Sequence, residues 1–249
     1  MPEYSITRSI TLDYACQEAI NTLCTNLSFL GTEKRRLLFT SAHPHEGKSF
    51  VSLSVAMTLS KLGYSVVLVD ADLRRSQLSS RYGIVYDKDS MMGLTHYLAG
   101  KCPMGDMLHY SRTAPMCLIP VRRTVTNSLA LLSTTRFSAL LDKLSSQFDF
   151  VIIDTPPLGA VIDAAEIAKH CDGSVLVIKY NSVSHREALE IKHQLERVDC
   201  PVLGAVLNDV DFKSLSSKKY YNKSYYYRYG NDYHTAAGRK TSAAMKKTP

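Results

Sequence analysis

The 249-residue chain is 45% hydrophobic and carries a formal net charge of +7. This composition suits one large α/β domain, and no apolar run approaches the ~20 residues that a membrane helix requires. The charge is uneven, because residues 213–249 hold nine basic residues and one acidic residue, whereas residues 1–212 hold 21 basic and 22 acidic residues. A body with no basic excess argues against nucleic-acid binding.

Taken in chain order, apolar periodicity first predicts an amphipathic helix over 13–30, capped by Asp13, and then a short strand over 36–40. The next helix runs from about 48 to 62, and Gly63 ends it. Apolar runs predict buried parallel strands at 66–69, 151–153, 175–178 and 202–207, with a weaker strand at 117–121. Helical patterns fall at 134–146, 162–170 and 184–197. This alternation predicts a single α/β domain with a doubly wound, mostly parallel sheet, whose ligands bind at the C-terminal ends of the strands.

The N-terminal segment and the cysteines indicate the cellular compartment. The N-terminus lacks an apolar core of signal-peptide length, and the six cysteines form no CxxC pair. Both features are typical of a reduced, cytoplasmic protein.

We expect order to end near residue 212, so that the domain spans 1–212 and a flexible basic tail spans 213–249. Such a tail can be simply solvated, or it can be drawn to an anionic membrane at about 1 kcal/mol per basic residue.

The tail also concentrates tyrosine. Seven of the fifteen tyrosines lie within fourteen residues that show no helical or strand periodicity. They are Tyr220, Tyr221, Tyr225, Tyr226, Tyr227, Tyr229 and Tyr233. A folded core does not gather aromatic residues in this way, so we predict that their hydroxyl groups are phosphorylated.

A phosphate-binding loop is predicted after the first predicted strand, 36–40, where residues 41–49 read SAHPHEGKS. The ending Gly47-Lys48-Ser49 between a strand and a helix matches the second half of a P-loop. In that pattern, backbone NH groups cradle the phosphates, Lys48 neutralises them, and Ser49 holds Mg²⁺. Ala42 stands where the first glycine of the pattern is expected, so this match alone is weak.

Three carboxylates strengthen the prediction of a nucleotide site. Asp70 and Asp72 follow one predicted buried strand, and Asp154 follows another. Each alone could be a turn or cap residue. Together, on the ligand-binding edge of one sheet that also carries Lys48 and Ser49, they suit a magnesium–nucleotide complex.

These motifs resemble those of the bacterial tyrosine kinases that control capsular and extracellular polysaccharide synthesis. The loop SxxPxEGKS is matched from Ser41 to Ser49, the motif Asp-x-Asp-x-Arg by Asp70, Asp72 and Arg74, and a third motif by Asp154 with the Thr-Pro-Pro that follows it. The stretch 93–100 and the tyrosine-rich tail also fit. The septum-positioning and plasmid-partition ATPases share the sheet, but they carry an early lysine where His43 stands and lack such a tail.

The resemblance implies a mechanism and a set of partners. ATP is held by Glu46, Gly47, Lys48 and Ser49, and Mg²⁺ by Ser49, Asp70, Asp72 and Asp154. Lys48, Asp70 and Asp72 are the implied catalytic residues, with Asp70 accepting the proton of the tyrosine. The implied partners are a transmembrane activator of the polysaccharide co-polymerase type, a counteracting tyrosine phosphatase and neighbouring copies of the chain. The protein would then be recruited from the cytoplasm to the inner face of the membrane.

Several positions depart from the family pattern. His45 replaces a loop glycine, and its ring can point to solvent or lie over the nucleotide. The ring-assembly motif Glu-x-x-Arg-x-x-Arg reads Glu18, Asn21 and Cys24, which puts the oligomer in doubt. Arginines 122 and 123 stand in a loop that is usually proline-rich, where they can be solvated or touch phosphate. Asn208 is a candidate for contacting adenine, or is only a strand-end turn residue.

The predicted function is therefore an ATP-dependent protein-tyrosine kinase that phosphorylates its own C-terminal cluster and regulates polysaccharide synthesis and export. Two alternatives stay open: an ATPase switch of the partition type, and a nucleotide-binding scaffold without turnover.

Overall fold

The structure, a computed structural model, describes residues 2–8, 10–31, 33–87, 92–111 and 114–210. Within these ranges nine strands form one sheet in the order β4-β1-β5-β6-β3-β7-β2-β8-β9. The strands are β1 Glu3–Ile6, β2 Arg36–Ser41, β3 Val66–Asp70, β4 Ile84–Tyr86, β5 His109–Ser111, β6 Cys117–Ile119, β7 Phe150–Asp154, β8 Gly173–Lys179 and β9 Val202–Asn208. The helices are α1 Tyr14–Ser28, α2 Lys48–Lys61, α3 Leu78–Tyr82, α4 Leu94–Leu98, α5 Met104–Met107, α6 Ser128–Leu132, α7 Thr135–Gln147, α8 Asp163–Ala168 and α9 His185–Glu196.

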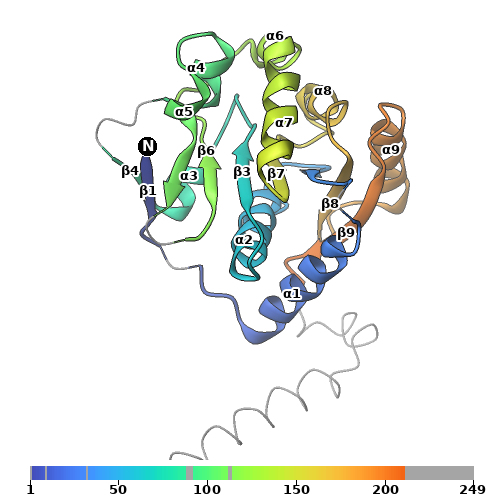
Figure 1. Cartoon of the computed structure of the whole chain (residues 1–249). Helices are drawn as coiled ribbons and strands as arrows, with labels where there is room; N and C mark the ends of the chain where they lie inside the picture. Colours follow the sequence, from blue (N-terminus) through green and yellow to red (C-terminus); the bar gives the residue numbers. More distant parts are fainter. Residues whose placement is uncertain (1, 9, 32, 88–91, 112–113, 211–249) are drawn as a thin grey trace, which may run out of the picture.

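Helices cover both faces of the sheet (Figure 1). Alternate residues of the central strands point to opposite faces, so each strand contributes to two separate cores. Leu38 of β2 and Val67 of β3 pack into a core formed with α4 to α9, whereas Leu37 and Leu68 pack into a second core with α1, α2 and α3. The doubly wound, mostly parallel α/β fold predicted from the sequence is thereby confirmed.

The predicted elements match the observed ones to within a few residues at each end. The predicted caps also agree: the Asp13 carboxylate accepts a 2.7 Å hydrogen bond from the Cys16 amide at the start of α1, and Gly63 follows the end of α2 with φ 97°. Five of the six cysteines are buried and all six are free thiols; Cys16 is exposed. None of the helices in the described ranges is both long enough and apolar enough to cross a membrane.

One prediction about burial was wrong, and three strands were not predicted. The run at 202–207 forms β9, which among the described strands lies at the edge of the sheet beside β8, and Leu207 is 47% exposed. An edge strand has a neighbouring strand on one side alone and is therefore more open to solvent than a central strand, so its apolar content does not imply complete burial. The short strands β1, β4 and β5 extend the opposite edge, where β4 is antiparallel to β1 and β5 is antiparallel to β6.

Candidate active site

The loop between β2 and α2 turns sharply because two of its residues lie in the left-handed region. Gly47, the residue before α2, has φ 90°, and His45 has φ 66°. Glycine adopts this conformation freely, whereas His45 must accept a steric cost. In the part of the chain that the structure describes, no side chain caps the start of α2, so its first amides remain available to an anion.

Glu46 anchors this loop from inside the protein. Its side chain is 1% exposed; Oε2 accepts a 2.8 Å bond from the His43 amide, and Oε1 accepts a 2.6 Å bond from the Ser182 hydroxyl after β8. The carboxylate therefore faces away from the pocket and positions the loop. The contact between Glu46 and ATP stays a prediction. Because the carboxylate is engaged inside the protein, the backbone of Glu46 would have to make that contact.

Asn208, at the end of β9, holds the loop from a second direction. Its Nδ2 donates a 2.9 Å hydrogen bond to the Glu46 carbonyl oxygen. A Cβ added at residue 47 would lie 2.0 Å from the same nitrogen, so any other residue there would displace the Asn208 side chain from this bond as well as strain the backbone at φ 90°. The predicted contact of Asn208 with adenine stays untested; the contact that the structure gives is with the loop.

Two of the predicted carboxylates lie side by side at the ends of adjacent strands. Asp70 of β3 and Asp154 of β7 are register partners, and both are almost fully buried. Burial, together with the nearby charge of Asp154, raises the pKa of Asp70 to about 8. Burial also raises the pKa of Asp154 to about 6, although the charge of Lys48 and a hydrogen bond from Ser49 oppose the change. The motif residues Lys48, Ser49, Asp70 and Asp154 are thus brought into one electrostatic cluster.

The segment after β3 is tied back onto this cluster. The Ser76 hydroxyl donates a short hydrogen bond to Asp70 Oδ2, and the Asp72 amide lies 3.3 Å from Asp70 Oδ1. Asp72 itself accepts a 3.0 Å bond from the Arg75 amide. Asp72 thereby stays at the wall of the pocket.

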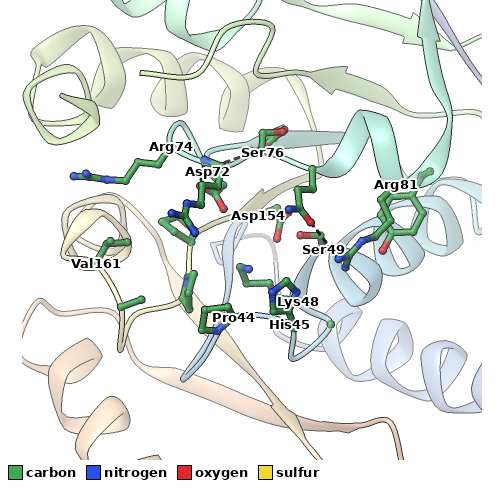
Figure 2. Close-up of a pocket in the computed structure, with 18 of the residues that line it drawn as sticks. Pro44, His45, Lys48, Ser49, Asp72, Arg74, Ser76, Arg81, Asp154 and Val161 are labelled. Carbon is green, nitrogen blue, oxygen red and sulfur yellow. Dashed lines mark hydrogen bonds between the residues drawn. The ribbon is translucent and has the colours of Figure 1, made fainter. Parts of the chain in front are cut away.

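A pocket of about 490 Å³ opens between the loop after β2 and the segment after β3. Figure 2 shows Lys48, Ser49, Asp72 and Asp154 directed toward this space. The lining residues are Pro44, His45, Gly47, Lys48, Ser49, Asp70, Asp72, Arg74, Arg75, Ser76, Gln77, Arg81, Tyr82, Val125, Thr126, Asp154, Pro156, Pro157, Ala160 and Val161. Neither Glu46 nor Asn208 is among them, and His45 stands at the rim.

Magnesium, which the resemblance implies, suits the chemistry of this cluster. Serine hydroxyl and carboxylate oxygens are the hard ligands that it prefers, and Asp154 Oδ1 is buried without a hydrogen-bond partner in the structure. Across the described ranges, no three His, Cys, Asp or Glu side chains converge into a metal site of their own. Phosphate and water oxygens would therefore have to complete the coordination of an ion held by Ser49 and the carboxylates.

The departures from the family pattern take clear positions. Cys24 is fully buried, and its thiol points to the Val55 carbonyl of α2, while Asn21 donates to Glu18 within α1. The Arg122 guanidinium lies 4.2 Å from the centre of the Tyr86 ring, which places it on an aromatic face. The seven tyrosines of the tail lie outside the described residues.

Sequence reasoning missed the residues that support the site. Ser182 holds Glu46, Ser76 bonds Asp70, and α3 contributes Gln77, Arg81 and Tyr82 to the wall. These residues belong to no motif. The one available signal was Glu46, a carboxylate between two apolar segments that needs a buried partner.

Sequence comparisons match the chain to known protein families. Residues 45–199 match the AAA domain family. The chain is 35% identical to the tyrosine-protein kinase CpsD of Streptococcus agalactiae over 78% of its own length and 84% of the relative's. It is 33% identical to CpsD of Streptococcus pneumoniae, over 86% and 92%.

Solved structures of a tyrosine kinase and of a cell division ATPase resemble the chain to different degrees. The kinase domain of the Escherichia coli tyrosine kinase ETK superposes with a TM-score of 0.75 at 31% identity, covering 80% of this chain and 77% of that one. The cell division ATPase MinD of Pyrococcus furiosus shares the fold alone, with a TM-score of 0.60 at 22% identity over 70% of this chain and 71% of that one. With tyrosine kinases matched at this identity over most of both chains, the protein belongs to the bacterial tyrosine-protein kinase family.

Proposed function

We propose that this kinase transfers the γ-phosphoryl group of ATP to tyrosine hydroxyls of its own C-terminal cluster, residues 220–233. The observation that carries the proposal is the pairing of Asp70 and Asp154 opposite Lys48 and Ser49 around an open pocket. Phosphoryl transfer demands positioning and charge neutralisation more than covalent chemistry, and this set supplies both.

Each residue has a distinct part in the proposed reaction. The amides at the start of α2 and the Lys48 ammonium hold the phosphates, and bound Mg²⁺ would neutralise charge on the transferred group. Asp70 accepts the proton of the tyrosine hydroxyl as the oxygen attacks the γ-phosphorus and the bond to ADP breaks. Burial raises the pKa of Asp70, which makes its carboxylate a stronger proton acceptor than an exposed aspartate. Asp72 and Asp154 would help to hold the Mg²⁺ ion.

The residue type at position 43 disfavours the alternative partition-type ATPase, because that family carries a lysine where this chain has His43. The early lysine of that family would stand here, yet His43 Nε2 lies 2.8 Å from Glu187 Oε1 of α9 in the same chain. The side chain is therefore engaged within its own subunit.

We further propose that a membrane protein activates the kinase and that a tyrosine phosphatase reverses the modification. Phosphorylating all seven tyrosines would add roughly −10 to −14 charges, at about −1.5 to −2 each. The tail, whose formal charge is +8, would become net negative. This reversal would release it from an anionic membrane or disperse an assembly, and polysaccharide synthesis would respond. A chain with glutamate at all seven positions should therefore associate less than the wild type; equal association refutes the switch.

Intact-mass spectrometry tests the kinase proposal directly. The full chain is co-expressed with a candidate membrane activator, alongside Lys48→Met and the matched control Lys61→Met at the far end of α2. We expect a ladder of phosphate additions mapping to Tyr220–Tyr233 in the wild type and the control, and none in Lys48→Met. Phosphate release without phosphotyrosine would instead indicate an ATPase, and nucleotide binding with neither product would indicate a scaffold.

A further inference from the structure

The buried carboxylate of Asp163, in the first turn of α8, joins three segments that line the pocket. Its Oδ2 accepts bonds from Arg74 Nε at 2.7 Å and from Ser128 Oγ at 2.5 Å, and its Oδ1 accepts from Arg74 Nη2 at 3.1 Å. Arg74 lies in the segment that carries Asp72; Ser128 follows the lining residues 125 and 126, and Asp163 follows the lining residues 156, 157, 160 and 161.

This arrangement is built to hold a charge. The Asp163 side chain is fully buried, as is Ser128. Burial alone would raise the pKa of Asp163, but the bonds from Arg74 and Ser128 hold it below its ordinary value. A bidentate arginine–carboxylate pair also fixes the mutual orientation of its two partners, which a single hydrogen bond does not.

The two halves of the active site are held by separate sets of contacts. Ser182 and Asn208 fix the phosphate loop through Glu46, whereas Asp163 fixes the Asp70–Ser76 segment through Arg74. A second contact on that side is the 2.9 Å bond from the Val125 amide to the Leu73 carbonyl. Loosening the Asp163 side should therefore disturb the catalytic carboxylates and leave the phosphate loop in place.

We infer that Asp163 is a positioning residue for phosphoryl transfer, which acts through Arg74 to hold Asp70 and Asp72 in place and contributes little to nucleotide binding. This inference rests on the proposed function for its kinetic consequence. Misplacing a catalytic group by about 1 Å can cost roughly 100-fold in rate. For Asp163→Asn we accordingly expect about a 10- to 100-fold loss of kcat, with the Kd for fluorescent ADP within about threefold of wild type.

The chain offers a matched control at the opposite end of the sheet. Asp172 is also paired with an arginine, since Arg36 donates to its Oδ1 from Nη2 at 2.6 Å and from Nε at 3.1 Å. Asp172→Asn removes a comparable ion pair away from the pocket and should leave kcat unchanged at a temperature where the fold persists. Equal kcat values for Asp163→Asn and Asp172→Asn would overturn the inference.

A double mutant tests whether Asp163 acts through Arg74. If it does, Arg74→Ala combined with Asp163→Asn should be no slower than the slower single variant, whereas independent roles would multiply the two losses. Should Asp163→Asn fail to fold, Ser128→Ala removes one of the three bonds. It should lower kcat about threefold or more at unchanged Kd; a wild-type kcat there would refute the role.

Amide hydrogen exchange separates this inference from the proposed function. In the full-length protein, Asp163→Asn should speed exchange at residues 71–76 and 125–128 and leave the exchange rates of residues 43–49 unchanged, while Asp172→Asn should change neither segment. If the wild type makes no phosphotyrosine, the proposed function fails, yet this measurement still decides the structural claim. Unchanged protection at residues 71–76 would overturn it.

Discussion

Replacing Asp70 by asparagine should make the nucleotide-free protein more stable while abolishing its activity. The Asp70 carboxyl has a pKa of about 8 in the folded protein against an ordinary value of 3.8. Each pKa unit corresponds to about 1.4 kcal/mol, so ionised Asp70 costs the folded state about 6 kcal/mol above pH 8. Asparagine has the same shape and still accepts the bond from Ser76, but it loses about 1 kcal/mol of contact with the Asp72 amide. We expect a net gain of about 4–5 kcal/mol at pH 8.5.

The dependence on pH identifies the cause. Because the folded state binds the Asp70 proton more tightly than the unfolded chain does, wild-type stability falls as pH rises from about 4 to about 8. The gain from Asp70→Asn should therefore be small at pH 5 and largest at pH 8.5. Urea unfolding at both values measures it, with phosphotyrosine formation as the activity assay. A gain independent of pH, or a loss of stability at pH 8.5, would refute the electrostatic reasoning.

Three further predictions concern other parts of the molecule. His45→Gly should stabilise the fold by about 0.5–1 kcal/mol in thermal unfolding, because glycine adopts the φ of 66° without steric cost; a loss would show that the imidazole makes a stabilising contact. Glu46→Gln should cost about 1–3 kcal/mol and weaken ADP binding in calorimetry, since one of its buried donors loses its acceptor; Glu190→Gln, at a carboxylate that is 59% exposed, should do neither, and equal effects would argue against an anchor. Tyr4→Phe should cost about 1 kcal/mol in urea, because the Tyr4 hydroxyl donates to the buried Met116 carbonyl; no change would mean that water replaces the bond.

The sequence was sufficient to predict the centre of the sheet and the reactive side chains. Strands such as Val66–Asp70 are buried on both faces, so they read as continuous apolar runs that end in a polar ligand. Lys48, Ser49, Asp70 and Asp154 come together because parallel strands bring their carboxyl ends to one edge.

The remainder depended on contacts between distant segments. The strands β1, β4 and β5 have three or four residues each, too few for periodicity to distinguish them from loops. Asp163 is one of several acidic residues near predicted helix starts, and only the fold places it 89 positions away from its partner Arg74. The same holds for Ser182 and Glu46, which are separated by 136 positions.

The hydrogen bond between Asn208 and the phosphate loop has a consequence for the order of synthesis. The loop is translated within the first fifth of the chain, whereas Asn208 and its strand come close to the end. Strand β2 also waits for its neighbours β7 and β8, which are translated in the second half. A nascent chain on the ribosome therefore carries the nucleotide-binding sequence long before it can hold that sequence in shape, so competence to bind ATP arrives only when the tyrosine-rich segment is about to emerge.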